Sequence, residues 1–428
     1  MIVHIVEELR AVGLDRLFVV VGKLEEQVRA AVGDRAEYIR QEEPLGTGHA
    51  ALQALPFLTR DGLVFVLTGD CPLVRREELA RLAEVAEQTG ATAVLTAELP
   101  DPFAFGRIIR DERGGVARIV EEKDAAPEER RVREVNGGIY AFQARHLHAA
   151  LPRLTGDNAQ GELLLTDCVA FIRAMGEAVV PVVAADPDDI LGINDRAQLS
   201  AAEEKLRRRI LLRHMQNGVT IRDPASTYID ADVAIGRDTV ILPGTRLAGR
   251  TVIGEDCVIG PHAQIENAAV GDGVTVNASV VLDSRIESGA GVGPFAYIRP
   301  GSAIGERAKI GDFVEIKNSA VGADTKVSHL SYIGDSDVGS GANIACGVVT
   351  ANYDGFRKHR TVIGDGSFIG CNVNLVAPVE VGEGAYIATG STVTEPVPAG
   401  GFAIARERQT TKPEYARALK ERLRTRGY

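Results

Sequence analysis

The sequence has no tryptophan, three methionines and only five cysteines in 428 residues. The cysteines show no CxxC spacing, which argues against a zinc site and against a disulfide framework; they are Cys71, Cys168, Cys257, Cys346 and Cys371. No apolar run approaches the ~18–20 residues of a membrane span, and the N-terminus lacks a secretory pattern. We therefore expect a cytoplasmic protein with reduced thiols and no membrane partner.

Positive charge is also in short supply. The chain has 48 Lys and Arg against 59 Asp and Glu, a net charge of −11. That balance argues against nucleic acid as a partner, although local basic sites stay possible. With 45% hydrophobic and 25% charged residues the chain should be globular. Because single cores rarely exceed about 250–300 residues, two or more domains are expected.

What the sequence has in abundance is a six-residue repeat between positions 229 and 393. An aliphatic residue recurs with that period, often followed by one of the 46 glycines. A period of six fits neither a helix nor long two-faced strands, whereas it fits the short strands and tight turns of a parallel β-helix. The alternative is an Ile/Val-rich β-sandwich, in which so long a six-residue ladder would arise only by coincidence. The ladder begins Ile229, Ile235, Ile241, Leu247, Ile253 and ends Ile369, Leu375, Val381, Ile387, Val393.

The first half alternates helical and strand patterns. Helices are predicted at 3–12, 25–32, 48–55 and 77–88, and strands at 16–21, 36–40, 63–67 and 92–99. This alternation indicates an α/β domain with a mostly parallel sheet. We therefore divide the chain into an α/β domain (1–195), a linker helix (196–217), a β-helix domain (218–402) and a basic C-terminal tail (403–428).

Two short motifs of the first half suggest ligand binding. Asp70 follows the predicted strand 63–67, where a carboxylate could hold a hard cation such as Mg²⁺. A Gly-Asp turn without any ligand is the alternative. The segment 46–49, Gly-Thr-Gly-His, precedes a predicted helix and could approach a base or phosphate, or be an ordinary helix start.

Counting along the β-helix places charged residues of the second half together. Three hexads make a coil, so Arg299 and Lys317, eighteen residues apart, should stack about 4.8 Å from each other. Two such cations repel unless an anion lies between them, and phosphate is the natural candidate. Two solvated surface cations are the alternative.

The same counting stacks Glu315 beneath Tyr332 and His329 above Cys346. A histidine near a phosphate site can serve as a general base, because its pKa lies near neutral. The ladder then breaks between Ile344 and Ile363, where the polar segment 352–358 predicts an extruded loop.

Several motifs occur in a characteristic order along nearly the whole chain. In the first half they are Gln41-x-x-x-Leu45-Gly46-Thr47-Gly48-His49-Ala50, Gly69-Asp70-x-Pro72-Leu73, Phe105-Gly106-Arg107-Ile108, Val120-Glu121-x-Lys123-Asp124, Asn136-Gly137-Gly138-Ile139 and Gly192-Ile193-Asn194-Asp195-Arg196. In the second half they are Arg299-Pro300-Gly301, Glu315-x-Lys317, His329-Leu330-x-Tyr332, Asn343 and Asn352-Tyr353-Asp354-Gly355. Together they resemble the bacterial bifunctional N-acetylglucosamine-1-phosphate uridyltransferase / glucosamine-1-phosphate acetyltransferase family.

For the first half, the resemblance implies a Rossmann-like nucleotidyltransferase in which a sugar phosphate attacks the α-phosphate of UTP and releases pyrophosphate. N-acetylglucosamine 1-phosphate would be the sugar substrate. Asp70 and Asn194 would bind Mg²⁺. UDP-N-acetylglucosamine would be held by Gln41, Gly46 and Thr47 at the uracil, by Gly106, Glu121 and Asn136 at the sugar, and by Asn194.

For the second half, the resemblance implies that His329 takes a proton from the amine of glucosamine 1-phosphate, which then attacks acetyl-CoA. Arg299 and Lys317 would hold the phosphate, and Glu315 would support the base. The residues that would orient the sugar are Tyr332, Asn343, Asn352 and Tyr353. Those along acetyl-CoA are Cys346, Gly347, Cys371, Thr389 and Arg406, of which Cys346 and Thr389 replace the usual alanine and Cys371 the usual serine. The coils would be left-handed and form a homotrimer with shared acetyl sites.

One part of the family pattern has no match. The family begins with a strand and a glycine-rich loop, Leu-Ala-Ala-Gly-x-Gly-Thr-Arg-Met, whereas residues 1–4 resemble the segment that follows it. We expect unpaired sheet edges and poor uridyltransferase activity, or else a true start upstream. The remaining alternatives are a non-catalytic regulatory scaffold, and a related sugar-phosphate uridyltransferase with an idle β-helix. A scaffold has no reason to keep Arg299, Lys317, His329 and the 352–355 loop together.

Overall fold

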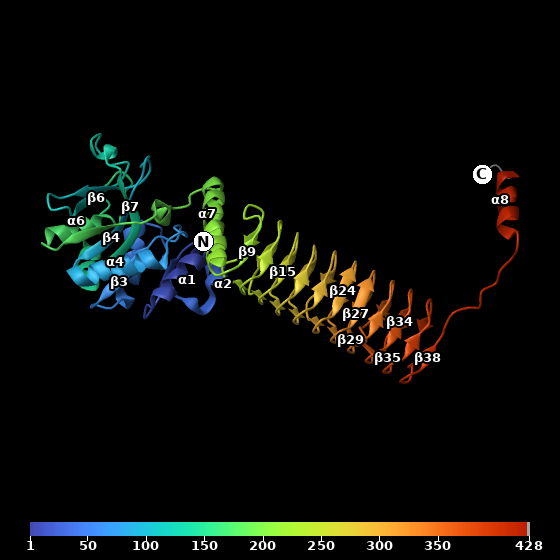
Figure 1. The fold of residues 1–428 in the computed structure, drawn as a ribbon. Helices are drawn as coiled ribbons and strands as arrows, with labels where there is room; N and C mark the ends of the chain where they lie inside the picture. The colour runs from blue at the N-terminus through green and yellow to red at the C-terminus, as the bar shows by residue number, and fades with distance from the viewer. Residues whose placement is uncertain (426–428) are drawn as a thin grey trace. The chain divides into compact units, whose positions relative to one another are not determined.

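The structure is a computed structural model that describes residues 1–425. The chain folds into two compact units, Met1–Leu206 and Arg207–Tyr428, each of which is described by itself (Figure 1). The last residues of the predicted basic tail, 426–428, lie outside the described residues.

The first unit begins with the predicted alternation of helices and strands. Its elements in order are α1 Ile2–Val12, β1 Phe18–Val21, α2 Glu25–Val32, η1 Gly33–Arg35, β2 Glu37–Arg40, α3 Thr47–Ala54, η2 Leu55–Phe57, β3 Leu63–Leu67, α4 Arg76–Thr89 and β4 Thr92–Glu98. The predictions for these helices and strands are confirmed to within two residues. Gly13 caps the C-terminus of helix α1, and its φ of 84° is the left-handed conformation that favours glycine.

The rest of the unit completes a six-stranded sheet. Its elements are β5 Arg107–Arg110, β6 Val116–Val120, η3 Glu129–Arg131, β7 Glu134–Gln143, α5 Ala144–Ala150, η4 Leu151–Arg153, α6 Asp167–Ala174, β8 Val179–Val183 and η5 Pro187–Ile190. The long strand β7 pairs antiparallel with β3, β4 and β5, and β6 pairs antiparallel with β5. Only the β4–β8 pair of this sheet is parallel. The prediction of a mostly parallel sheet is therefore wrong here, because β7 runs against its neighbours.

Strands β1 and β2 form a separate two-stranded parallel sheet. Among the pairings of residues 1–425, β1 has β2 as its partner and β3 has β7, so one edge of each strand is unpaired, as expected from the sequence. Two apolar clusters stabilise the unit: one around Phe142 and Leu147, and one around Leu82 and Leu95, all of them fully buried.

The second unit is the predicted parallel β-helix, preceded by the helix α7 (Arg196–Gln216). Figure 1 shows its short strands stacked coil upon coil. They form three parallel sheets of ten, nine and eleven strands, with Tyr228 paired to Arg246 and Ala234 to Val252 one coil later. The aliphatic ladder fills the interior, since Ile241, Ile316 and Ile387 are fully buried.

The ten-stranded sheet comprises β10 Tyr228–Ile229, β13 Arg246–Ala248, β16 Gln264–Glu266, β19 Val280–Leu282, β22 Tyr297–Ile298, β25 Glu315–Lys317, β28 Tyr332–Gly334, β31 Val349–Ala351, β34 Asn374–Val376 and β37 Thr392–Val393. The nine-stranded sheet comprises β11 Ala234–Ile235, β14 Val252–Ile253, β17 Ala269–Val270, β20 Arg285–Ile286, β23 Ala303–Ile304, β26 Ala320–Val321, β29 Ser336–Val338, β32 Thr361–Ile363 and β35 Val379–Val381. The eleven-stranded sheet comprises β9 Thr220–Ile221, β12 Val240–Ile241, β15 Val258–Ile259, β18 Thr275–Val276, β21 Gly291–Val292, β24 Lys309–Asp312, β27 Lys326–His329, β30 Asn343–Ile344, β33 Phe368–Ile369, β36 Tyr386–Ile387 and β38 Phe402–Ala403. A last helix, α8, spans Tyr415–Thr425.

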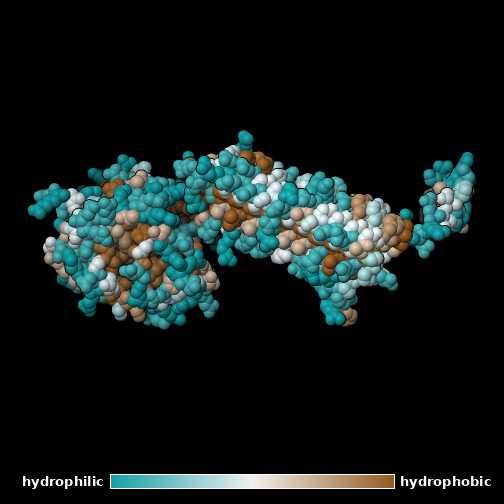
Figure 2. All heavy atoms as spheres, turned by 60° about the horizontal axis from the view of Figure 1, so that its bottom comes forward, coloured by the Kyte–Doolittle hydropathy of each residue, from teal (hydrophilic) through white to brown (hydrophobic). Residues whose placement is uncertain are grey.

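Three large apolar side chains project from one corner of the β-helix. Phe295, Phe313 and Leu330 lie between strands of the eleven-stranded and ten-stranded sheets, in the left-handed conformation with φ of 61°, 55° and 44°. Each is 58–60% exposed, and the two phenyl rings stack 5.4 Å apart. We call these three residues the apolar corner. Figure 2 shows hydrophobic surface at intervals along the β-helix and on the first unit. No helix in residues 1–425 is long and apolar enough to cross a lipid bilayer.

Candidate active sites

Asp70 lies just beyond the carboxyl end of β3, next to a segment that is distant in the sequence. Its backbone carbonyl accepts a hydrogen bond from the Ile193 amide at 3.0 Å. A Cβ placed on Gly192 would lie 3.3 Å from Asp70 Oδ2, so glycine gives this segment its close approach. Asn194 follows directly. The structure thus brings together the two residues to which the resemblance assigns Mg²⁺.

Gln41, Gly46 and Thr47 form a second group, at the start of α3. The Gln41 side chain lies 3.4 Å from the Gly46 carbonyl oxygen and 2.9 Å from His49 Nδ1. Gly46 has a φ of 116°, and a Cβ there would lie 2.5 Å from the Leu163 carbonyl oxygen. Only glycine fits this position. The Thr47 hydroxyl accepts a hydrogen bond from the backbone amide of Leu165 at 3.1 Å.

Gly106, Glu121 and Asn136 form a third group. The backbone amide of Asn136 donates to the Gly106 carbonyl at 2.8 Å. A Cβ on Gly106 would lie 3.4 Å from Glu121 Oε2. Burial raises the pKa of the Glu121 carboxyl, although a 3.0 Å hydrogen bond from the Thr166 hydroxyl opposes that rise. A carboxyl that is costly to ionise suits hydrogen bonding to sugar hydroxyls.

A groove of about 920 Å³ connects two of these groups within the first unit. It is lined by residues of α1, β1, β3 and α3, among them Thr47, and by Asp70. Strands β1 and β3, each with one unpaired edge, both contribute to its walls. Most of the groove is apolar, with polar residues at the ends of the strands.

In the β-helix, the predicted cation pair is present and each cation has its own carboxylate. The Arg299 amide bonds the Ile316 carbonyl at 2.8 Å, which places Arg299 one coil from Lys317. Arg299 Nη1 lies 2.7 Å from Glu315 Oε1, and Lys317 Nζ lies 2.9 Å from Asp335 Oδ2. Protein carboxylates therefore compensate the positive charges of Arg299 and Lys317, whereas counting along the sequence predicted a bound anion in that place.

A third cation, Lys358, approaches from the extruded loop. The neighbouring Lys317 ammonium is the main reason that the pKa of Lys358 is lowered, and Arg299 lowers it further. Three cations close enough to repel one another favour an anion at this position. Sequence analysis missed Lys358 because it lies in the loop, where the hexad count no longer applies.

Asp335 organises this cluster and was also missed. It is 5% exposed and accepts hydrogen bonds from Lys317, from Asn318 Nδ2 at 2.7 Å and from Asn352 Nδ2. Asn352 Nδ2 also lies 3.3 Å from the Tyr332 hydroxyl. Counting misses Asp335 because the step here is seventeen residues: the register partner of Lys317 is Gly334, and Asp335 follows it directly.

The predicted base, His329, has a different carboxylate partner from the one expected. His329 Nδ1 lies 2.5 Å from Asp312 Oδ1, and the two residues are register partners in β24 and β27. The resemblance assigned support of the base to Glu315. In the structure, Glu315 is the register partner of Tyr332, as counted from the sequence, and its carboxylate binds Arg299.

His329 and the cations lie on different sheets. His329 ends β27 of the eleven-stranded sheet, whereas Lys317 belongs to the ten-stranded sheet, with the apolar corner between them. Asn343 is also in the eleven-stranded sheet, paired with Lys326 and Phe368. Within one described chain, His329 and Asn343 therefore do not join the group of Arg299, Lys317, Tyr332 and Asn352.

The residues expected along acetyl-CoA form a row that starts at His329. Cys346, Cys371 and Thr389 each follow a strand of the eleven-stranded sheet by two residues. The backbone carbonyls of Cys346 and Cys371 accept hydrogen bonds from the next coil at 2.8 Å. A Cβ on Gly347, which has a φ of 74°, would collide with the Asn372 side chain.

Arg406 reaches the far end of this row, because its Cδ lies 3.6 Å from the position of a Cβ on Gly390.

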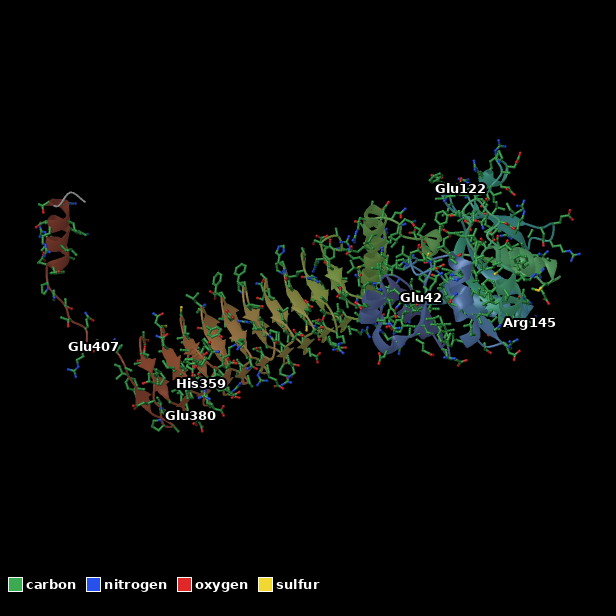
Figure 3. The ribbon with its side chains drawn as sticks, turned by 180° about the vertical axis from the view of Figure 1, so that it is seen from behind. Glu42, Glu122, Arg145, His359, Glu380 and Glu407 are labelled. Atoms are coloured by element: carbon green, nitrogen blue, oxygen red, sulfur yellow. The ribbon has the colours of Figure 1, made fainter. Side chains whose placement is uncertain are left out.

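The extruded loop is confirmed, between β31 and β32. The Tyr353 hydroxyl donates to the Gly355 carbonyl at 2.7 Å, so this side chain turns back into the loop. His359, labelled in Figure 3, contacts Asp354 at 2.7 Å and anchors the loop to Asn352 through its backbone amide. Phe356, at 94% exposed, lies at the tip.

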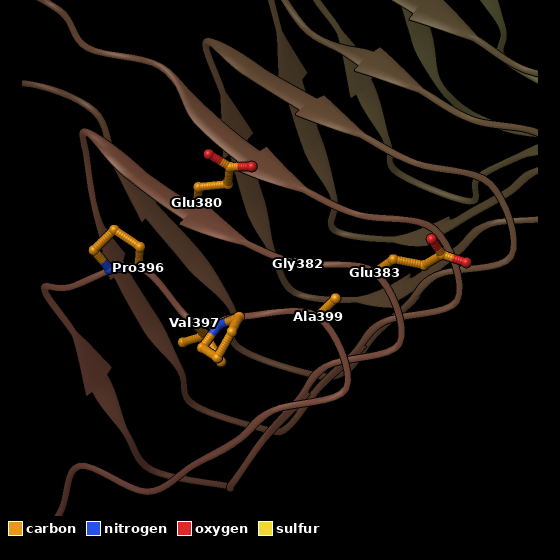
Figure 4. Close-up of a pocket in the computed structure, with 7 residues that line it drawn as sticks. Glu380, Gly382, Glu383, Pro396, Val397 and Ala399 are labelled. Atoms are coloured by element: carbon orange, nitrogen blue, oxygen red, sulfur yellow. The ribbon is translucent and has the colours of Figure 1, made fainter.

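A second cavity, of about 490 Å³, lies on the last coils. It is lined by Glu380, Gly382, Glu383 and residues 396–399 (Figure 4). It contains none of the site residues predicted from the sequence.

Comparison with known proteins gives a family for both halves. Residues 1–170 match the MobA-like NTP transferase domain, and residues 360–395 match the bacterial transferase hexapeptide family. Bifunctional protein GlmU of Brevibacillus brevis is 53% identical over 98% of this chain and 91% of the relative. The GlmU protein of Caldanaerobacter subterraneus is 51% identical over 96% of this chain and 90% of its own length.

The chain belongs to the bifunctional GlmU family. It is a bifunctional transferase of UDP-N-acetylglucosamine biosynthesis, in which a uridyltransferase domain precedes a left-handed β-helix that carries the acetyltransferase activity. Like other GlmU proteins it acts on small molecules. Among solved structures, an apo UDP-glucose pyrophosphorylase resembles 49% of this chain and 89% of its own, at a TM-score of 0.39 and 16% identity, too weak a likeness to bear on the fold.

Proposed function

We propose that the β-helix transfers the acetyl group of acetyl-CoA to the amine of glucosamine 1-phosphate, with His329 as the general base. The observation that carries the proposal is the placement of Arg299 one coil from Lys317, with Lys358 near enough that both cations lower its pKa. Sugar phosphate is an anion of the right class, and arginine with lysine supplies forked and point-charge contacts to it. Tyr332 and Asn352 lie beside the cations and would orient the sugar, together with Tyr353 of the loop.

Acetyl-CoA would extend along the row that runs from His329 through Cys346, Gly347, Cys371 and Thr389 to Arg406. Three coil steps span about 14 Å, a length that suits an extended pantetheine arm with its thioester at His329. The substrate nitrogen would then attack the thioester carbonyl carbon. Its proton would pass to the imidazole, and the carbon–sulfur bond would break to release CoA thiol.

We further propose that two copies of the chain complete each acetyltransferase site. His329 and the cations lie on neighbouring sheets separated by the apolar corner. Exposed stacked phenylalanines are unusual on a monomer surface and typical of subunit contacts. A homotrimer that buries this corner would set His329 and Asn343 of one subunit beside the cations of the next.

For the first unit we propose uridylyl transfer from UTP to N-acetylglucosamine 1-phosphate. Gln41, Gly46 and Thr47 would contact the uracil, and Gly106, Glu121 and Asn136 the sugar. In residues 1–425 no three His, Cys, Asp or Glu side chains cluster as metal ligands. The carboxylate of Asp70 and the amide of Asn194 are nonetheless hard oxygen donors that fit Mg²⁺, whose other positions substrate phosphates can fill. When bound, Mg²⁺ would neutralise the charge of the triphosphate.

The proposed functional division is 1–195 for uridylyl transfer, 196–217 as linker, 218–402 for acetyl transfer and 403–428 as a basic tail. The cytoplasmic location expected from the sequence stays a prediction, and so does the absence of a nucleic-acid partner.

The acetyltransferase proposal is tested by thiol release from acetyl-CoA with glucosamine 1-phosphate as acceptor. His329→Ala should lower kcat by about 10²–10⁴-fold, the usual contribution of a general base. His148→Ala, in the first unit, is the matched control and should keep the wild-type rate. Equal rates for wild type and His329→Ala would show that the proposed base is wrong.

A further inference from the structure

Asp312 is held against His329 by an unusually close approach of two strands. It is the last residue of β24, and its Oδ1 lies 2.5 Å from His329 Nδ1. A Cβ on Gly311 would collide with the backbone carbonyl of Ser328, so only glycine lets the ends of β24 and β27 come this near. The next residue, Phe313, turns away with a φ of 55°.

The chemistry of the contact fixes which imidazole nitrogen is basic. The hydrogen bond from His329 lowers the pKa of Asp312, so the carboxylate is ionised and can only accept. Nδ1 of His329 must therefore carry the proton in this contact. In the neutral ring, Nε2 then has the free lone pair, and it lies on the opposite side of the ring from Asp312.

We infer that Asp312 is the positioning residue of the acetyltransferase base: it holds His329 in the tautomer whose Nε2 accepts the amine proton, and it stabilises the imidazolium that forms. This inference rests on the proposed role of His329. It assigns to Asp312 the part that the resemblance gave to Glu315, whose carboxylate is engaged by Arg299.

The proton balance of the step follows from this arrangement. The new nitrogen–carbon bond forms as the amine proton moves to Nε2 of His329, while Nδ1–H stays bonded to Asp312. As the carbon–sulfur bond breaks, the Nε2 proton passes to the leaving sulfur, which restores the neutral ring. Asp312 stays ionised throughout.

The charge of Asp312 also sets the pH dependence. Lys309 on β24 and Lys326 on β27 are the cations of the two strands that bear the pair, and Cys346 follows the next strand of the sheet, β30. Both lysines disfavour the imidazolium, whereas Asp312 favours it. Without the Asp312 charge, the acid limb of the activity profile should therefore move to lower pH.

The test compares kcat/KM against pH for wild type, Asp312→Asn, Asp312→Glu, Glu315→Gln and Asp324→Asn. Asp312→Asn should lower kcat at least about tenfold and move the acid limb of the profile down by about one pH unit. Asp312→Glu should restore the position of that limb in part, because it restores the charge. Glu315→Gln should chiefly raise KM for the sugar phosphate and leave the limb in place.

Asp324→Asn removes a surface carboxylate that pairs with Arg307, and it should behave as wild type. The inference is overturned if Asp312→Asn leaves the acid limb unmoved, or if Glu315→Gln moves it instead. If His329→Ala keeps the wild-type rate, the base itself is wrong and the inference falls with it. If Asp312→Asn keeps the wild-type acid limb while His329→Ala is inactive, the inference about Asp312 is contradicted and the proposed base stands.

Discussion

The two halves of this chain place their functional residues by different means. In the β-helix, every coil pairs with the next through a fixed register, so the position of a side chain follows from counting. In the first unit, the sheet is divided and a groove separates β1 from β3. There, site residues are held by contacts between segments that are far apart in the sequence, such as Gly192 against Asp70. A repeat therefore makes a site predictable, whereas the position of an α/β site depends on how its loops meet.

The largest expected effect concerns the assembly of the β-helix, because an acetyltransferase site that worked in a single chain would contradict the shared site. We predict that Phe313→Asp, in the apolar corner, gives a monomer and lowers acetyltransferase activity by at least about 10³-fold, because a buried unpaired charge opposes the contact. Sedimentation and thiol release measure the two effects. Phe356→Asp, at the exposed tip of the loop, is the matched control and should stay oligomeric.

A mixture of His329→Ala and Lys317→Ala chains tests the shared site directly. If each site takes its base from one subunit and its cations from the next, co-expressed chains regain about a quarter of the wild-type activity. Failure of this mixture to regain activity, with trimers present, would contradict the shared site.

The two halves should also lose stability independently. Ile241→Ala in the ladder and Leu82→Ala in α4 both truncate fully buried side chains, and each should cost about 2–5 kcal/mol of its own unit's free energy of unfolding. Calorimetry should therefore show one transition lowered and the other unchanged in each variant. Ile241→Val, which keeps most of the volume, should cost only about 0.5–1.5 kcal/mol. If both transitions shifted together, the units would not be separate.

The smallest effect concerns two carboxyls with opposite shifts. Burial raises the pKa of Glu121, so its contribution to stability is present below the ordinary pKa of glutamate and is lost as pH rises through the folded value. Burial opposes the ionisation of Asp335 too, but hydrogen bonds from Asn318, Lys317 and Asn352 outweigh it and lower its pKa. The contribution of Asp335 to stability is present above the ordinary pKa of aspartate and is lost as pH falls through its pKa in the folded protein.

Melting curves between pH 3 and 8 check this contrast. Acid should destabilise the β-helix transition more in wild type than in Asp335→Asn. Glu121→Gln should raise the melting temperature of the first unit at neutral pH. Parallel pH profiles for both units would contradict the assignment of the two shifts.

Much of the β-helix could be predicted from the sequence, because the hexads fix both the fold and the register. Counting placed Arg299 beside Lys317 and Glu315 beside Tyr332. It could have reached Asp312, the register partner of His329 one slipped coil earlier, but not Asp335, because the same slip pairs Lys317 with Gly334. It could not reach Lys358, because the loop leaves the ladder.

The first unit was predictable only in its local elements. Helices and strands up to β4 follow from periodicity within a few residues. The antiparallel course of β7 and the β5–β6 pair do not, because strand order depends on contacts between distant segments. For the same reason Asp70 and Asn194 could be joined only through a resemblance to known proteins.

The nearest-neighbour pairing of the coils has an evolutionary consequence. Because a coil contacts only the coils above and below it, one eighteen-residue turn could be duplicated or deleted between Ile241 and Ile259, where the register is regular and no proposed site residue lies. The length of that part of the β-helix is thus free to drift among descendants, whereas the span from Arg299 to Thr389 must keep its count of turns or lose its chemistry.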